Sequence, residues 1–216
     1  MDHRLKLLFV VVLTVIITLA GTFVTEYVRQ SMTFSWGVDV GDEFLYEVSV
    51  TGNTTTTTQI LPPIFAPMNN TRIVVEIVSL PNLTLYYSDI PFIQDVINHV
   101  KTIVRFENGS DIPTEFYYAI NNHASNSILP IGAWGYLGSL FPNQINQAIS
   151  NQEMYISVTK PDSFYFGYWL NETTSTSEWH GILNLNTGVP IDFSFSILRI
   201  GQPWVYSYNV TMTLVD

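Results

Sequence analysis

Apolar and polar side chains alternate over several stretches of the chain, and this two-residue period is typical of β-strands that bury one face. The alternation is regular over 43–51, 191–197 and 204–214. The Gly52-Asn53 pair predicts a tight turn, from which the threonine run 54–58 returns as the second strand of a hairpin. Shorter strands are expected at 72–80, 83–87, 104–107, 115–120, 154–159, 163–170 and 177–184.

Two other stretches repeat their apolar residues every three to four positions, which is the period of an α-helix. The first begins at Pro91 and ends near Lys101. The second covers 134–150 and is broken by Pro142. We therefore expect an α+β, mainly β fold, in which a curved antiparallel meander of about eight to ten strands packs against one or two helices.

The segment 7–24 holds 18 residues without a charge. As a helix it would be about 27 Å long, close to the hydrocarbon thickness of a bilayer. Arg4 and Lys6 precede it, which favours a cytoplasmic N-terminus and export of everything that follows. We expect a transmembrane anchor, and a cleaved secretory signal is the alternative. The chain then divides into the leader 1–25, a polar neck 26–35 and one extracytoplasmic domain, 36–216.

Composition narrows the classes of partner. The formal net charge is −10, so a nucleic-acid partner is not expected. The absence of cysteine rules out disulfides and thiolate metal sites. The partners expected are the membrane, through 7–24, and a lipid or a surface protein of unknown identity.

Six Asn-x-Ser/Thr triplets follow the leader, and each is a potential acceptor of N-linked sugar. They begin at Asn53, Asn69, Asn82, Asn108, Asn171 and Asn209. Used as acceptors, they would give a surface poor in charge a solubilising coat; the alternative is that a Thr-rich chain produces such triplets by chance.

Several polar residues have spacings that could support chemistry. Asp39, Asp42 and Glu43 supply three carboxylates that could bind calcium, although the ordered series of an EF-type loop is missing.

The histidines are the other candidates. His99 follows Asp95 by one helical turn, Glu178 and His180 share one face of a strand, and His123 lies in a polar stretch expected to be a loop. None of them has an identifiable third partner, and no nucleophile, metalloprotease or phosphate-loop motif occurs. We expect no catalytic, metal or cofactor site and no enzyme.

Aromatic side chains dominate one face of the last two strands. Those that could line a cavity for an apolar ligand are Phe193, Phe195, Trp204, Tyr206 and Tyr208. The favoured interpretation is that they form the core. The last strand could also pair with a neighbouring subunit by strand addition.

Three short motifs carry a resemblance. They are Trp36-Gly37 with Gly41-Asp42 and Tyr46, then Pro130-Ile131-Gly132-Ala133-Trp134, and Asn186-Thr187-Gly188-Val189. Together they resemble a group of uncharacterised membrane-anchored surface proteins of Asgard-type archaea. The late turn and the strand after it are also similar to the lipoprotein-carrier half-barrel, although the lipid-anchoring cysteine of many such carriers is missing. Neither resemblance implies catalytic residues.

These observations favour a single-pass surface protein whose glycosylated β-rich domain serves binding or envelope structure. The first alternative is an extracytoplasmic carrier of a lipid or another apolar ligand. The second is a filament subunit that assembles by strand addition. The localisation expected is the cell membrane, with 26–216 outside the cytoplasm, or secretion if the leader is cleaved.

Overall fold

The computed structural model describes residues 34–83, 100–132, 134, 153–201 and 203–215, together with five positions of the leader. The chain divides into two compact units, Met1–Thr33 and Phe34–Asp216. The leader positions described, Thr14, Val15, Ile17, Thr18 and Gly21, are helical. In the part of the chain described, no helix is long and apolar enough to cross a membrane. Most of the expected anchor 7–24 lies outside that part.

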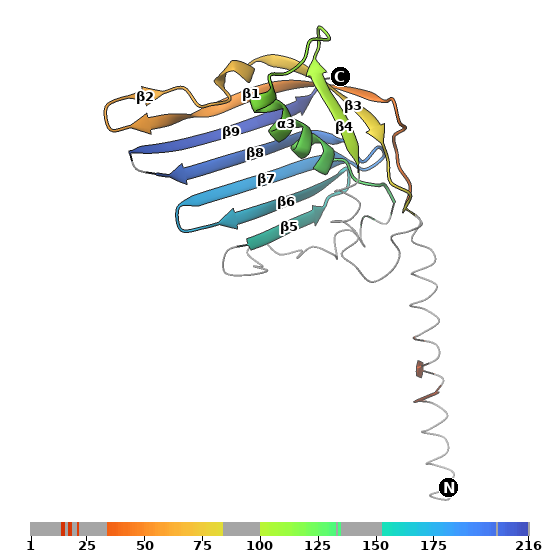
Figure 1. The fold of residues 1–216 in the computed structure, drawn as a ribbon. Coiled ribbons are helices and arrows are strands. Elements are labelled where there is room, and N and C mark those ends of the chain that lie inside the picture. The colour runs from red at the N-terminus through yellow and green to blue at the C-terminus, as the bar shows by residue number, and fades with distance from the viewer. Residues whose placement is uncertain are drawn as a thin grey trace, which may run out of the picture. The chain divides into compact units, whose positions relative to one another are not determined.

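The described residues of the second unit form one antiparallel sheet of nine strands (Figure 1). Their order is β4-β3-β1-β9-β8-β7-β6-β5, and β2 pairs with the far end of β1. The bounds are β1 Glu43–Thr56, β2 Ile60–Leu61, β3 Thr71–Ser79, β4 Lys101–Phe106, β5 Glu153–Thr159, β6 Ser163–Asn171, β7 Ser175–Asn184, β8 Pro190–Ile200 and β9 Trp204–Leu214. Residues 153–214 therefore form a five-stranded meander, whose last strand pairs with the first strand of the domain.

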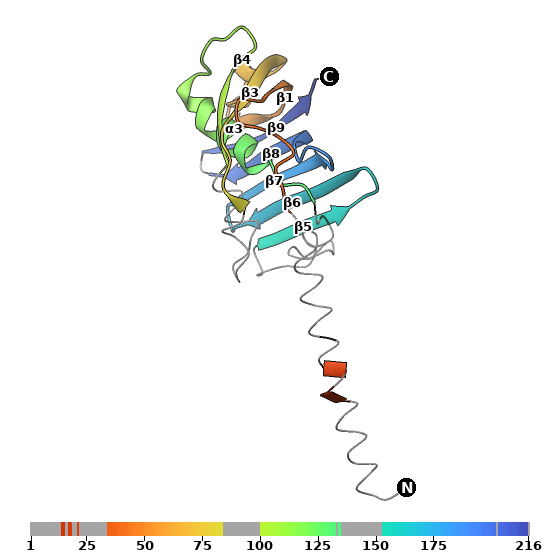
Figure 2. The same ribbon diagram turned by 90° about the vertical axis from the view of Figure 1, so that its right-hand side faces the viewer.

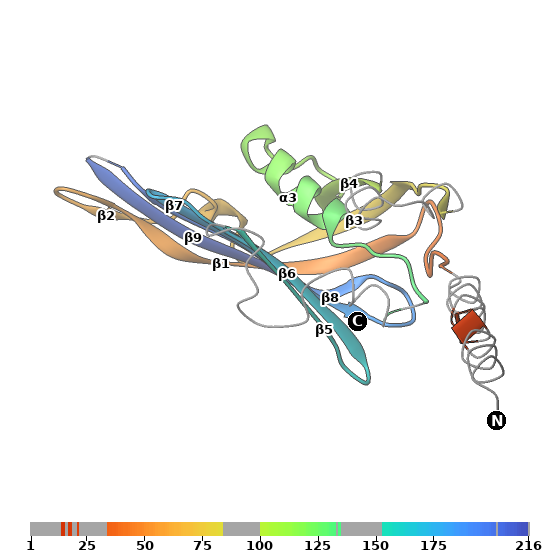
Figure 3. The ribbon, with the colours of Figure 1, turned by 90° about the horizontal axis from the view of Figure 1, so that it is seen from below.

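One α-helix, α3 (Thr114–Asn126), is described in this unit, and it packs on one face of the sheet (Figure 3). We call the face that α3 covers the inner face and the opposite one the outer face. The core of the inner face joins the sheet to α3 and to the short 3-10 helix η1 (Ala66–Met68). Its largest fully buried side chains include Tyr46, Phe193, Met68, Ile73 and Ile120.

The antiparallel, mainly β fold and most of its strands are confirmed. The strands expected at 154–159, 163–170, 177–184, 191–197 and 204–214 are β5 to β9. Alternation identifies them because every second side chain enters the inner core, as Phe193 and Phe195 do on β8. A turn at Asn108-Gly109 follows β4 and is closed by the Gly109 N–H, which donates to the Phe106 carbonyl at 2.8 Å.

The tight turn expected at Gly52-Asn53 is wrong. β1 runs through Gly52 to Thr56, and the hairpin turns at Thr57 to Gln59 instead. Gly52 has φ +118°, and a Cβ there would collide with the carbonyl oxygen of Ser207 on β9. This glycine therefore permits close approach of two strands and does not end one.

The strand expected at 115–120 is also wrong, because this stretch belongs to α3. Pro113 stands at its N-cap, and Phe116, Ile120 and Ala124 are buried at four-residue spacing. A strand would have buried Tyr118 as well, but that side chain is 71% exposed. His123 thus lies on a helix and not in a loop.

Residues 91–99 and 135–150 lie outside the described residues. The two helices expected there, from Pro91 to near Lys101 and over 134–150, therefore stay predictions. The helix expected from Pro91 ends no later than Lys101, because strand β4 begins at that residue. Of the strand expected at 83–87, only Leu83 is described, and it is not in a strand.

The three motifs of the resemblance meet at one end of the sheet. Ser35, beside Trp36, exchanges two backbone hydrogen bonds with Ile131. The Leu129 N–H donates to the Gly188 carbonyl at 3.0 Å, and a Cβ on Gly188 would collide with the Leu129 carbonyl. Backbone contacts thus hold the segments that carry the three motifs together, which is a structural role.

Candidate functional site

The outer face of the sheet places two rows of polar side chains side by side. The register gives a first row Ser49, Thr211, Ser194 and His180, and a second row Thr51, Asn209, Ser196, Glu178 and Trp169. We call these nine residues the polar rows. They cross β1, β9, β8, β7 and β6, a distance of about 19 Å at the usual strand separation.

The β1, β9 and β8 part of the polar rows carries hydroxyl and amide groups and no charge. Ser49 and Thr51 are exposed, while Thr211, Asn209 and Ser196 are half-buried. Ser and Thr hydroxyls and the Asn amide can each donate and accept hydrogen bonds. This part of the surface is suited to an uncharged ligand with many hydroxyl groups.

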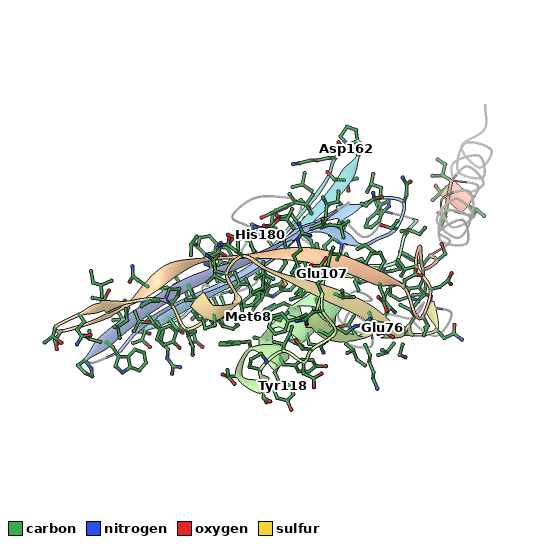
Figure 4. All side chains as sticks on the ribbon, turned by 90° about the horizontal axis from the view of Figure 1, so that it is seen from above. Met68, Glu76, Glu107, Tyr118, Asp162 and His180 are labelled. Atoms are coloured by element: carbon green, nitrogen blue, oxygen red, sulfur yellow. The ribbon has the colours of Figure 1, made fainter. Side chains whose placement is uncertain are left out.

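The β7 end of the polar rows holds a cluster of interacting side chains. The Ser194 Oγ lies 3.0 Å from His180 Nε2, and His180 Nδ1 lies 3.4 Å from Glu178 Oε1. His180 is labelled in Figure 4, on the side of the sheet opposite α3 and Tyr118. The cluster joins the expected pair Glu178 and His180 to a third partner, Ser194, that sequence spacing did not reveal.

The cluster has the residue types of a Ser-His-Glu triad but not its geometry. The Ser194 Oγ is also 3.3 Å from His180 Nδ1, so it lies almost equally far from both ring nitrogens and not along one lone pair. Ser194 is only 4% exposed, which leaves its hydroxyl beneath the histidine. The arrangement therefore holds His180 in place and does not present a nucleophile to a substrate.

Two aromatic rings on β6 lie beside this cluster. Trp169 is 40% exposed and pairs across the strands with Glu178. The Tyr165 ring centre is 5.8 Å from that of His180, and burial together with the charge of Glu178 raises the pKa of Tyr165. Trp169 thus places a partly exposed aromatic ring beside the Glu178 carboxylate, which is also partly exposed.

The five aromatic residues considered for an apolar cavity share the inner face. Phe193, Phe195 and Tyr208 are buried, and Phe65 packs against the last two with ring centres 5.6 and 4.8 Å apart. Tyr206 stacks between Trp204 and Tyr208. Phe193, Phe195 and Tyr208 therefore belong to the packed core of the described residues, whereas Trp204 is 37% exposed.

Two surface cavities are present elsewhere in the described part of the domain. One, of about 390 Å³, is lined by Asn70, Arg72, Phe106, Glu107 and Asn108. The other, of about 330 Å³, lies between β4 and the start of α3, beside Ile112 and Tyr117. Neither is lined by any of the five aromatic residues.

His123 is a half-buried base with an apolar neighbour. It lies on the last turn of α3, and its ring stacks on Phe195 with centres 4.2 Å apart. Burial lowers the pKa of His123 to about 4. It is therefore uncharged at neutral pH and packs against the core.

The carboxylates near the entry of β1 serve separate local contacts. The Asp42 Oδ2 accepts from the Asp39 N–H at 2.8 Å, and Glu43 pairs with Arg105 at 2.6 Å. Across the described residues, no group of three or more His, Asp or Glu side chains could hold a metal ion. His99 and Asp95 lie outside that range.

Five of the six acceptor asparagines are exposed, and Asn209 is half-buried. Asn108 lies in the turn after β4, where its Oδ1 accepts from the Ser110 N–H at 2.9 Å. Asn171 ends β6 at a hairpin. Asn209, in contrast, stands in the middle of the polar rows.

Comparison of the chain with known proteins found no matching family model, no matching curated protein and no matching solved structure. The fold itself therefore defines the class at the level of a mainly antiparallel α+β domain with one open sheet.

Proposed function

We propose that this chain is an extracytoplasmic surface protein whose domain binds neutral glycans through the polar rows. The observation that carries the proposal is the cross-strand register, which aligns uncharged hydroxyl and amide groups with Trp169 and Glu178 on one open face. Surface display rests on the leader 7–24 and on the five exposed acceptor asparagines.

The chemistry of a sugar matches this face in two ways. The C–H face of a pyranose ring stacks on an aromatic ring, which Trp169 supplies. Its hydroxyl groups need both donors and acceptors, which the Ser, Thr and Asn side chains and the Glu178 carboxylate supply. An anionic polymer is less suited, because the β1, β9 and β8 part of the rows contains neither Lys nor Arg.

The test is binding of the full chain to a panel of neutral polysaccharides. The detergent must not be a maltoside or glucoside, because its sugar headgroup would compete. We expect Trp169→Ala to weaken binding about tenfold or more, as loss of an aromatic contact that carries much of the binding energy does. Glu178→Gln should weaken it about tenfold, since hydrogen bonds to a charged acceptor contribute about 1.5–3 kcal/mol.

The matched control is Tyr118→Ala, which removes an exposed aromatic ring from α3 on the other side of the sheet. Binding that Tyr118→Ala weakens as much as Trp169→Ala would contradict the assignment to the outer face. Failure to bind any neutral polysaccharide in the panel would contradict the function.

A further inference from the structure

Apolar side chains are concentrated where β1 turns into β2 and β8 turns into β9. Figure 2 shows β1, β9 and β8 side by side in the sheet. We call residues 54–61 together with 198–201 and 203–206 the hairpin end. Its exposed apolar side chains are Ile60 (75%), Ile200 (56%), Leu61 (43%), Leu198 (41%) and Trp204 (37%).

These side chains cover both faces of the hairpin end. The register aligns Ile60, Thr55, Val205 and Ile200 in one row on the outer face. The adjacent row, on the inner face, holds Leu61, Thr54, Tyr206 and Arg199. A protein partner covers one face of such an element, whereas a lipid layer surrounds it on both faces.

The hairpin end is almost free of charge, with Arg199 as its single charged residue. Trp204 and Tyr206 stack with ring centres 5.1 Å apart, and these two residue types favour the membrane interface. Arg199 forms a hydrogen bond with Tyr206, so a cation stands beside these rings, at the level where lipid phosphates would lie.

Hydrogen bonds close both turns, so the backbone groups that make them need no water when they enter lipid. The Thr56 N–H donates to the Gln59 carbonyl at 2.8 Å, and the Thr56 Oγ1 accepts from the Gln59 N–H at 3.0 Å. In the second turn the Gly201 N–H donates to the Trp204 carbonyl at 2.8 Å.

From these four observations we infer that the hairpin end inserts shallowly into the interface of a zwitterionic lipid bilayer. The site is independent of the polar rows and of the proposed function. Two acceptor asparagines limit how deep the sheet can enter if they carry sugar: Asn53 on β1, directly before the hairpin end, and Asn171 on the neighbouring β6–β7 hairpin.

The absence of cysteine allows a single label at each chosen position. The full chain, made without sugar, is labelled with an environment-sensitive fluorophore at Ile60→Cys or Ile200→Cys and reconstituted into phosphatidylcholine vesicles. Quencher-bearing lipids are placed either in that bilayer or in vesicles added afterwards. The control is Tyr118→Cys, which is exposed but lies outside the hairpin end.

We expect the labels at 60 and 200 to be quenched in at least one of the two arrangements, with emission shifted to shorter wavelength, while the label at 118 is not. Combining Ile60→Thr with Ile200→Thr should remove most of the quenching of a label at Leu198→Cys, without changing the circular dichroism spectrum. Quenching equal to that at 118 would overturn the inference. So would labels that quench one another between chains, because a second copy would then cover the hairpin end.

Discussion

At the scale of single residues, His123 shows how a half-buried polar side chain can pack against a core. Its ring stacks on Phe195, and burial lowers its pKa to about 4. The unfolded chain takes up this proton near pH 6.5, the ordinary value, whereas the folded chain does so only near pH 4. Between these values the unfolded state binds more protons, so falling pH favours unfolding.

We therefore predict that His123 makes the domain less stable in acid. As the pH falls from about 6.5 through about 4, the native chain should lose up to about 3 kcal/mol of unfolding free energy through this residue. His123→Gln should lose correspondingly less over the same range. Urea unfolding of both chains at several pH values measures the difference, and parallel pH profiles would contradict a buried neutral histidine.

Asn209 is the acceptor asparagine whose position makes the sharpest prediction. Its Nδ2 donates to the Thr211 Oγ1 at 3.2 Å within the polar rows, so a sugar there would cover the proposed binding surface. We predict that protein from its native source carries sugar on exposed acceptors such as Asn108 and Asn171 but not on Asn209. Glycopeptide mass spectrometry measures occupancy at each site. Sugar on Asn209 would contradict the binding surface, and a chain without sugar throughout would contradict the glycoprotein assignment.

At the scale of elements, the two-residue period predicts where strands lie but not how two strands approach each other. The five strands of the 153–214 meander follow from alternation because each buries one face. Gly52 misled the prediction, since a glycine in a strand and a glycine in a turn look alike in a sequence. The stretch 115–120 misled it as well, since Phe116 and Ile120 fit both a two-residue and a four-residue spacing.

Gly52 provides the test at this scale. We predict that Gly52→Ala lowers the free energy of unfolding by about 2–4 kcal/mol, because it adds a collision with β9 to an unfavourable φ. Gly109→Ala is the matched control, since Gly109 also has positive φ but has open space where a Cβ would lie. It should cost about 1 kcal/mol. If both variants lost the same unfolding free energy in thermal or urea unfolding, the close approach of β1 and β9 would not contribute to the cost of Gly52→Ala.

At the scale of the whole molecule, the candidate site depends on long-range register. Glu178 and His180 could be paired from sequence because they lie two residues apart on one strand. Ser194 could not, because its place beside His180 is set by the pairing of β7 with β8. Asn209 joins the rows through the pairing of β8 with β9, and Thr51 joins them because the last strand pairs with the first. Alternation indicates which face a side chain takes but not its neighbour across the sheet.

The most direct test of glycan binding by the polar rows is a radical footprint of the full chain with and without a neutral polysaccharide that it binds. We predict that the ligand slows modification of Trp169, on the outer face, and leaves Tyr118 and Trp204 unchanged. Protection of Tyr118 with no change at Trp169 would place the ligand on the other side of the sheet and contradict binding at the polar rows.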